Sequence, residues 1–533
     1  MNITKSAIVL VAAAALVAMS VARAAEQKPA PDLWELARAK APVHRFSTLV
    51  MAGDVRDLLT PAGGIDAAID WCRKTGVTKV YLETFRGNYQ AERPTLLEAK
   101  RRFTEAGFEV SGCVTTTVVG KKSTGWNQIS CYTDLPTQKR LQEIFEFTAG
   151  LFDEIMIDDF WFTDCECSEC RAARQAKTVR IGEDRSFLVA SDSWADYRCE
   201  LMTRLSQLRI LEPAQAINPR VKIIIKYPQW YDRFHERGYD VVRQTELFDR
   251  TWVGTETRDY LDQRWGGTPQ YEAYFIMRWL GGIGGEKCGG GWYDPLGTTE
   301  KTYIEQARQT VLGGARESML FCYGILLKNH GPRDVEALRE HIPELLNVAA
   351  EIAERKPVGI AAYKPPSSPP QNEPRVFDFV GMLGLPLVPC HEFPADARAA
   401  FFSVHAMKDP QFTERLKSFL KGGRRALITD GLAKQLAGTV DLKRENVRVL
   451  DVKGDPKSLL ELDQPALASL RKPLLAPYER SFEAPPRVAL YLFDDGSWVI
   501  ENFGDEAAVA KLDGAEHQVP ARGWLYQWQR TRQ

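Results

Sequence analysis

Short apolar segments alternate with longer amphipathic segments between about residues 44 and 355. Short apolar runs bounded by polar residues are typical of buried strands, whereas a 3.6-residue repeat is typical of helices that cover a sheet. The segments predicted as strands are residues 44–52, 79–85, 109–117, 154–162, 222–228, 250–258, 291–294 and 317–326. Helices are predicted between them at 64–75, 95–106, 137–151, 194–211 and 299–312. This alternation favours an α/β fold with a (β/α)8 TIM barrel over an open doubly wound sheet.

The pattern changes after a helix predicted at 336–355, which closes a barrel domain of residues 25–356. Strands at 358–363, 385–390, 399–404 and 425–429, with a helix at 410–421, predict a small Rossmann-like α/β domain over 357–445. Beyond it, strands at 487–493, 497–502 and 507–512 alternate with period two around the turn Asp494-Asp495-Gly496. We therefore expect a C-terminal β-sandwich domain at 446–533.

The first 24 residues have the pattern of a secretory signal peptide. Lys5 supplies the positive charge, residues 8–19 are apolar, and Ala22-Arg23-Ala24 is a small-x-small cleavage site. The prediction is a periplasmic or secreted protein, with a retained N-terminal anchor as the alternative. No later stretch approaches 18 apolar residues, so no stable membrane span is expected after signal cleavage.

Composition narrows the class of partner. The chain has 69 basic and 70 acidic residues, and this balance argues against a nucleic-acid partner, which needs a basic surface. No Gly-x-Gly-x-x-Gly segment opens a helix after a strand, so no organic cofactor is expected. The 13 Trp and 17 Tyr residues lie mostly near predicted loops, which suits a carbohydrate substrate because sugar rings pack on aromatic faces.

Acidic residues follow the apolar runs of three predicted strands. In TIM barrels the carboxyl ends of the strands line the active site, and glycoside hydrolysis needs two carboxylates across one pocket. Asp159 and Glu256 are the first predicted catalytic pair, with Asp158 and Asp294 in reserve. Alternation predicts that one of Asp158 and Asp159 points into the barrel and the other toward the helices. The alternative is that an aspartate caps a helix or pairs with Lys226 or Arg258.

Other polar and aromatic residues fall at the same strand ends and loops, where they are predicted to bind the substrate. Part of the aromatic set is expected to fill the core between barrel and loops instead. The predicted substrate-binding residues are Glu83, Trp126, Trp161, Lys226, Trp230, Tyr231, Arg258 and Trp292.

Four of the ten cysteines are closely spaced. Cys165, Cys167 and Cys170 follow the fourth strand, and Cys131 lies 34 positions upstream of Cys165. Four thiolates suit a tetrahedral zinc site with no open position, so we predict a structural zinc cofactor. A disulfide or free thiols are the alternatives, although a Cys-x-Cys disulfide would be strained.

These cysteines and the segment Cys131-Tyr-Thr-Asp-Leu-Pro resemble the zinc cluster of the beta-galactosidases of glycoside hydrolase family 42. The order of a barrel, an amidotransferase-like domain and a small β-domain is also similar. The resemblance implies cleavage of an oligo- or polysaccharide by a galactosidase-like exo-enzyme, and a homo-oligomer, a trimer, formed through the middle domain.

The catalytic positions differ from that family. Its fourth strand ends in Asn-Glu, where this chain has Asp158-Asp159, and its seventh-strand glutamate has no counterpart here except Glu286 in a glycine-rich loop. An aspartate at the end of the fourth strand with an acid on the sixth is similar to the alpha-galactosidase clan, in which that aspartate is the nucleophile.

Two other classes of function remain open. A non-catalytic carbohydrate-binding or assembly protein would keep the aromatic residues and tolerate the loss of Asp159 and Glu256. An esterase or amidase would need an activated nucleophile, and the chain has no Gly-x-Ser-x-Gly elbow.

Overall fold

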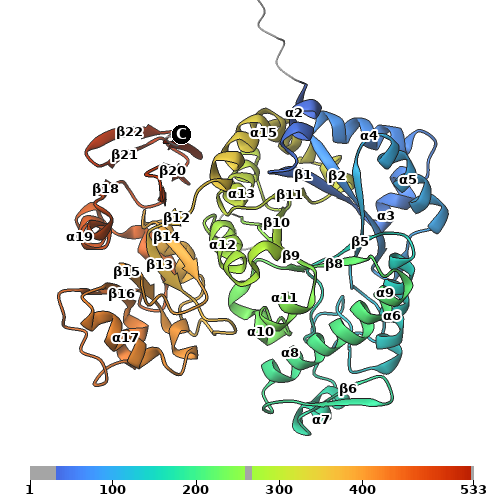
Figure 1. The fold of residues 1–533 in the computed structure, drawn as a ribbon, viewed down its shortest axis with the longest axis horizontal. Coiled ribbons are helices and arrows are strands. Elements are labelled where there is room, and N and C mark those ends of the chain that lie inside the picture. Colours follow the sequence, from blue (N-terminus) through green and yellow to red (C-terminus); the bar gives the residue numbers. More distant parts are fainter. Residues whose placement is uncertain (1–31, 259–266, 530–533) are drawn as a thin grey trace, which may run out of the picture.

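A computed structural model of the chain describes residues 32–258 and 267–529, and its main body is a closed eight-stranded parallel barrel (Figure 1). β1 pairs with both β2 and β11, which closes the sheet on itself. The predicted TIM barrel is therefore confirmed. The barrel strands are β1 (Arg45–Val50), β2 (Val77–Arg86), β4 (Glu109–Val114), β5 (Glu154–Ile157), β8 (Lys222–Tyr227), β9 (Arg250–Gly254), β10 (Cys288–Tyr293) and β11 (Glu317–Leu320).

Helices surround the barrel because their apolar faces pack on its outer surface. Each of the five predicted helices is present, and the longest, predicted at 194–211, continues through a π-helical turn into a further short helix. The surrounding helices are α4 (Gly64–Lys74), α5 (Arg93–Glu105), α6 (Leu135–Ala149), α8 (Trp194–Leu205), α9 (Glu212–Ile217), α12 (Glu272–Gly284), α13 (Glu300–Leu312) and α15 (Gly331–Ala353).

Most barrel strands differ in length from their predictions, and β10 and β11 show two of the differences. β11 ends at Leu320, and the remainder of the predicted segment forms the short helix α14 (Tyr323–Leu326). β10 begins at Cys288 and includes the glycine run, because Trp252 of the neighbouring strand fills the space beside it. A Cβ atom on Gly289 would lie 2.4 Å from the Trp252 ring, so only glycine fits in this strand.

The barrel interior is a layer of side chains to which every strand contributes one residue. Side chains alternate between the two faces of a strand, so the residue two positions further along also points inward. This alternation decides which polar groups reach the upper mouth of the barrel. The interior layer consists of Leu49, Tyr81, Cys113, Met156, Ile224, Trp252, Trp292 and Met319, with Cys322 beside it.

The part of the chain after the barrel forms a separate lobe beside it, orange to red in Figure 1. Its first sheet is parallel, in the order β14-β13-β15-β16-β17, as expected for a Rossmann-like unit. β17 extends this sheet beyond the predicted boundary at residue 445. The sheet contains β13 (Ile360–Tyr363), β14 (Leu387–Cys390), β15 (Ala399–Phe402), β16 (Arg425–Thr429) and β17 (Val447–Leu450), with helices α16 (Val376–Gly381), α17 (Phe412–Lys421) and α18 (Asp430–Gln435).

Two antiparallel sheets complete the chain, which agrees with the predicted β-sandwich. Helix α19 (Gln464–Leu475) precedes them, and β12 (Pro357–Val358) pairs with β19 although it comes before the middle sheet in the chain. One sheet has β12, β19 (Val488–Phe493), β20 (Trp498–Asn502) and β23 (Gly523–Gln527), and the other has β18 (Phe482–Glu483), β21 (Ala508–Leu512) and β22 (Ala515–Val519).

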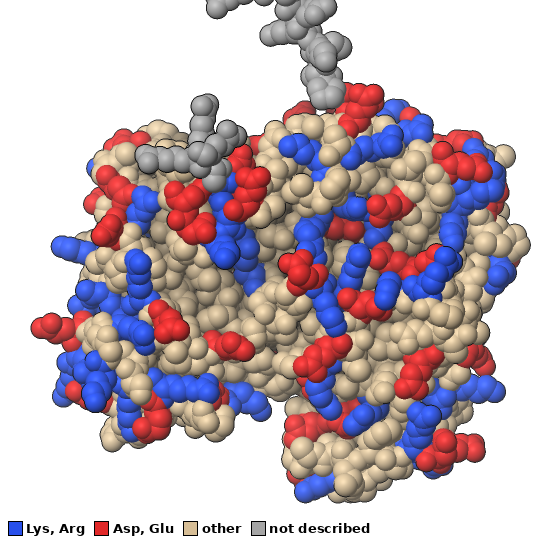
Figure 2. Space-filling model, in the orientation of Figure 1, with Lys and Arg blue, Asp and Glu red and all other residues tan. Residues whose placement is uncertain are grey.

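The predicted signal peptide lies outside the described residues. Among the helices of residues 32–258 and 267–529, none combines the length and apolar character needed to cross a membrane. Basic and acidic side chains are interspersed over the face of the molecule shown in Figure 2.

Candidate active site

The upper mouth of the barrel carries polar groups two positions beyond the interior layer. Tyr81 is followed by Glu83, Met156 by Asp158, Ile224 by Lys226 and Trp292 by Asp294. From β9 the same alternation runs from Trp252 through Gly254, the last residue of the strand, to Glu256 just beyond it. Strand alternation therefore places these groups around one axis at the carboxyl ends of the strands.

A cavity of about 700 Å³ opens at this mouth. All four carboxylates predicted to be catalytic line it, so residues from β5, β9 and β10 meet there as expected for a TIM-barrel site. Its lining consists of Arg86, Trp126, Asp158, Asp159, Phe160, Phe162, Lys226, Gln229, Trp230, Arg233, Arg237, Glu256, Arg258, Trp292, Asp294, Leu296, Phe321 and Arg375.

Lys226 lies between the two carboxylates of the first predicted pair. Its Nζ donates to Asp159 Oδ2 at 2.7 Å and to Glu256 Oε1 at 2.6 Å. The two acceptor oxygens can be no farther apart than these distances combined, about 5.3 Å. The ammonium also lies 4.1 Å from the centre of the Trp292 ring, so it is held by a cation–π contact from below.

Asp158 belongs to a second, more deeply buried cluster. Its Oδ2 accepts from Arg86 Nη2 at 2.8 Å and from Thr115 Oγ1 at 3.0 Å. The Arg86 Nε donates in turn to both oxygens of Glu83, whose Oε2 also accepts from the Ala52 backbone at 2.7 Å. Glu83 thus fixes the arginine that neutralises Asp158.

The two neighbouring aspartates differ in protonation. Burial raises the pKa of Asp159 to about 7, and the attraction of Lys226 only partly offsets it. Burial also acts to raise the pKa of Asp158, but Arg86 and Lys226 outweigh it, so its pKa lies below the ordinary value. Asp158 is therefore an ionised group, whereas Asp159 can hold a proton near neutral pH.

Asp294 is paired with Arg258, whose Nη2 donates to both of its oxygens at 2.9 and 2.8 Å. Burial raises the pKa of Asp294 to about 6 despite this partner. Both alternative pairings considered from the sequence are therefore present, Asp159 with Lys226 and Asp294 with Arg258. Both ion pairs line the cavity, so an aspartate can be paired with a cation and still belong to the candidate site.

Asp158 and Asp159 both line the cavity, whereas alternation predicted that one would face the helices. The reason is that β5 ends at Ile157, so the backbone after Asp158 no longer follows the strand. The Asp159 carbonyl accepts from Tyr239 Oη at 2.6 Å, which holds this turn. Asp159 keeps 17% of its side chain exposed, against 2% for Asp158.

The predicted substrate-binding residues divide into two groups. Trp126, Lys226, Trp230, Arg258 and Trp292 line the cavity. Glu83, Trp161 and Tyr231 do not, because each is buried behind the wall. The Trp161 indole donates to Ser206 Oγ at 2.9 Å and the Tyr231 hydroxyl to Asp378 Oδ2 at 3.0 Å.

Sequence reasoning did not select several lining residues as site residues. Arg86 is at the end of β2, and its position three residues after the buried Glu83 was the available signal. Arg375 lies between β13 and α16 in the Rossmann-like unit, which we call the middle lobe, and no pattern in the neighbouring sequence marked it as a site residue. The other unselected lining residues are Phe160, Phe162, Gln229, Arg233, Arg237, Leu296 and Phe321.

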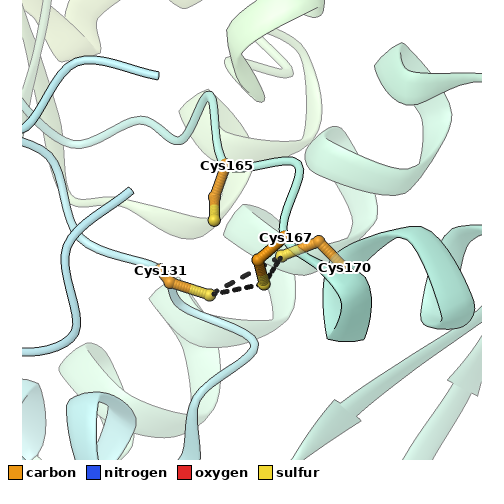
Figure 3. Close-up of side chains that lie close together, drawn as sticks. All are labelled: Cys131, Cys165, Cys167 and Cys170. Atoms are coloured by element: carbon orange, nitrogen blue, oxygen red, sulfur yellow. Dashed lines mark hydrogen bonds between the residues drawn. The ribbon is translucent and has the colours of Figure 1, made fainter. Parts of the chain in front are cut away.

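Three of the four clustered cysteines, Cys165, Cys167 and Cys170, lie in the segment between β5 and the first turn of α7 (Ser168–Gln175), whereas Cys131 lies in the loop between β4 and α6. The strands β6 (Thr178–Ile181) and β7 (Arg185–Leu188) follow α7. Their Sγ atoms all lie within 4.8 Å of one another, and Figure 3 shows them converging. The separations of 3.6 Å for Cys131–Cys170 and 3.8 Å for Cys131–Cys167 match the edge of a tetrahedron of sulfurs about 2.3 Å from a zinc, about 3.8 Å. The cysteines are not disulfide-bonded, so the donor set fits a structural metal.

Asp164 connects this cluster to the cavity wall. It precedes Cys165, and its Oδ2 accepts from the Trp126 backbone at 2.9 Å and from Arg237 Nη1 at 3.1 Å. Trp126 is 46% exposed and lies 5.6 Å from the Phe160 ring. The cysteine-bearing segment thus positions the outer aromatic wall of the cavity.

Comparison with known proteins agrees with this geometry. A family model described as "Probable glycosyl hydrolase, catalytic domain" matches residues 30–340, more than half of the chain. An uncharacterised protein of Saccharolobus solfataricus is 27% identical over 349 residues, a match that covers 61% of this chain and 56% of that relative. The chain thus matches little more than half the length of this curated relative.

Among solved structures, the first of the two that follow shares the fold of this chain. Alpha-L-fucosidase isoenzyme 2 from Paenibacillus thiaminolyticus superposes with a TM-score of 0.58 at 10% identity, over 87% of this chain and 89% of that one. The exo-beta-1,4-mannosidase Op5Man5 from Opitutaceae bacterium strain TAV5 has a TM-score of 0.49 at 11% identity, over 72% and 76% of the two chains.

Proposed function

Since the chain belongs to the family of probable glycosyl hydrolases, whose catalytic-domain match spans all eight barrel strands, we propose that it is an exported glycoside hydrolase that cleaves an oligo- or polysaccharide. The observation that carries the proposal is the placement of Asp159 and Glu256 on one lysine at the carboxyl ends of the strands. Two carboxylates in one cavity are the machinery that this reaction requires.

The environments of the two carboxylates suggest separate roles. Burial raises the pKa of Asp159 to about 7, so this group can hold the proton that the leaving oxygen must receive. Glu256 Oε1 is bonded to Lys226, and its Oε2 is buried without a hydrogen-bond partner. We assign Asp159 as the acid/base and Glu256 as the nucleophile.

The reaction then takes two steps. Glu256 attacks the anomeric carbon and forms an ester bond to the sugar while Asp159 protonates the departing oxygen. Asp159 next removes a proton from water, and that water displaces Glu256. Oxygens no more than about 5.3 Å apart are closer than the separation of about 6.5–9.5 Å typical of inverting enzymes, so retention is the expected outcome.

The decisive experiment measures hydrolysis of aryl glycosides and oligosaccharides by wild type, Asp159→Asn and Glu256→Gln. Both variants should lose most activity on oligosaccharides with folding intact. Asp159→Asn should keep more activity on an activated aryl leaving group, because such a group departs without a proton. Glu286→Gln is the matched control, since this carboxylate is 98% exposed and precedes β10 at the opposite end of the barrel.

Full activity in either variant would remove that residue from the proposed mechanism and favour Asp158 or Asp294. Binding of oligosaccharides without any hydrolysis would support the second candidate, a non-catalytic carbohydrate-binding protein. Such a protein would bind sugars through the same aromatic wall, which is formed by Trp126, Phe160, Phe162 and Trp230.

We further propose that the four cysteines bind a structural zinc. Zinc would hold the segment before α7 in place through bonds from four thiolates, with no position left for substrate. Signal cleavage, export to the periplasm or medium, galactosidase-like specificity and oligomerisation through the middle lobe stay predictions of this proposal.

A further inference from the structure

The charges on the cavity wall are unevenly distributed. Three cations near the floor, Arg86, Lys226 and Arg258, are bonded to the carboxylates of the cavity itself. The other charged residues of the lining, within the described part of the chain, are all arginines, namely Arg233, Arg237 and Arg375.

The carboxylates that pair with these three arginines lie outside the lining. Arg233 is bonded to Glu236 at 2.7 Å, Arg237 to Asp164 at 3.1 Å and Arg375 to Glu272 at 3.0 Å. Each carboxylate occupies only part of its arginine, because a guanidinium has five N–H donors, so donors remain for a ligand. We call Arg233, Arg237 and Arg375 the arginine rim.

Arg375 is the member of the rim that the middle lobe supplies. It stands just before α16, and its backbone N–H donates to Asp232 Oδ2 at 2.9 Å, which ties it to the loop after β8. Its side chain is 22% exposed, whereas Glu272 behind it is fully buried. The cavity is therefore completed by a residue from outside the barrel.

The charge of Arg375 is only partly cancelled by its partner. Burial raises the pKa of Glu272 to about 8, and Arg375 only partly opposes this. At pH 7 Glu272 therefore retains its proton in most molecules. The charge that Arg375 presents to the cavity is then incompletely balanced by Glu272, which favours an anionic ligand beside it.

The other two members flank aromatic side chains. The helical turn η3 (Tyr231–Arg233) begins directly after Trp230 and ends at Arg233. The next helix, α10 (Phe234–Arg237), ends at Arg237. The Arg237 guanidinium lies 5.4 Å from the centre of the Phe162 ring. A sugar that stacks on these aromatic rings would place its substituents next to guanidinium groups.

We propose that the substrate is an acidic glycan, whose carboxylate or sulfate group is bound by the arginine rim with Arg375 as the main determinant of specificity. Planar guanidinium groups bind carboxylates and sulfates through paired N–H donors. The inference rests on the proposed hydrolase function, because it assigns the substrate class of the same cavity.

The test compares matched glycans that differ only in charge. Uronic acid oligosaccharides, their neutral hexose counterparts and sulfated counterparts are offered to wild type, Arg375→Gln and Arg375→Lys, and both hydrolysis and calorimetric binding are measured. Wild type should prefer an acidic member by about tenfold or more, the size of one charge-assisted hydrogen bond. Arg375→Gln should lose that preference, measured as the ratio of kcat/KM for acidic and neutral glycans, and Arg375→Lys should restore part of it. A preference for uronides or for sulfated sugars identifies the anion.

Arg220→Gln is the control for an equal change of net charge, because Arg220 is 81% exposed and does not line the cavity. Equal hydrolysis of neutral and acidic glycans, unaffected by Arg375→Gln, would overturn the acidic-substrate inference and leave the hydrolase proposal standing. Preferential binding of acidic glycans without hydrolysis would overturn the hydrolase proposal and leave the acidic-ligand inference standing. Binding of no glycan at all would overturn both.

Discussion

Lys226 Nζ lies 2.6 Å from Glu256 Oε1, and the same nitrogen lies 2.7 Å from Asp159 Oδ2. One buried ammonium thus holds together the two carboxylates to which we assign the chemistry. Burial alone would lower the pKa of Lys226, but Asp159, Glu256 and Asp158 raise it above the ordinary value, so the lysine stays charged.

Replacing the lysine tests this arrangement. In Lys226→Met the two carboxylates would face each other without a cation, and the pKa of Asp159 would rise further because Lys226 lowers it. We expect kcat/KM to fall by about 100-fold or more and the alkaline limb of its pH profile to move to higher pH. An unshifted pH profile would show that Lys226 does not control the acid. Lys222→Met, on the exposed start of β8, is the control.

The pH dependence of the wild type follows from Asp159. The proposed acid works only in its protonated form, and its pKa is about 7. With substrates that have poor leaving groups, kcat/KM should therefore fall about tenfold per pH unit above pH 7. An activated aryl glycoside should lack this limb. The same limb in Asp159→Asn would assign it to another group.

Buried carboxyls at the contact between the barrel and the C-terminal sheets predict a pH-dependent stability. Burial raises the pKa of Glu305 to about 8 and that of Glu501 to about 7. The folded state thus binds protons that the unfolded state releases above its ordinary glutamate pKa. The contribution of each group to stability is complete below about pH 4.5 and declines as pH rises, up to about pH 8 for Glu305 and about pH 7 for Glu501, by up to about 1.4 kcal/mol per pH unit.

Glu501→Gln should remove part of this decline, because glutamine keeps the hydrogen-bonding shape at Gln309 and Tyr491 without a titrating proton. Urea unfolding at pH 5.5 and 8.5 measures the effect. The variant should gain stability relative to wild type at the higher pH. An equal difference at both pH values would contradict the prediction.

The cysteine cluster predicts one bound zinc per chain. Cys165→Ser should lower the zinc content measured by elemental analysis and reduce the melting temperature. It should also raise KM, because Asp164 beside it holds the Trp126 backbone and Arg237. Cys390→Ser is the control, since this thiol lies in the middle lobe. Wild-type protein that contains no zinc, and a Cys165→Ser variant as stable as wild type, would argue against a structural metal.

Much of the barrel was predictable because its signal is local. A run such as Ile155-Met156-Ile157 identifies a buried strand, and the acids that follow it are costly to bury unless they are used or paired. The four candidate carboxylates were found in this way. The cysteine spacing was equally readable, since Cys165, Cys167 and Cys170 are neighbours in the chain.

The sequence by itself therefore determined the strands, their order and the acids at their ends, since each depends on residues only a few positions apart. Only the tertiary structure decided which side chains contact one another. It set Lys226 between Asp159 and Glu256, buried Glu83 and Trp161 behind the wall, and brought Arg375 from another lobe into the cavity. These relationships join residues far apart in the chain, and they depend on how strands close and lobes pack, which no local pattern encodes.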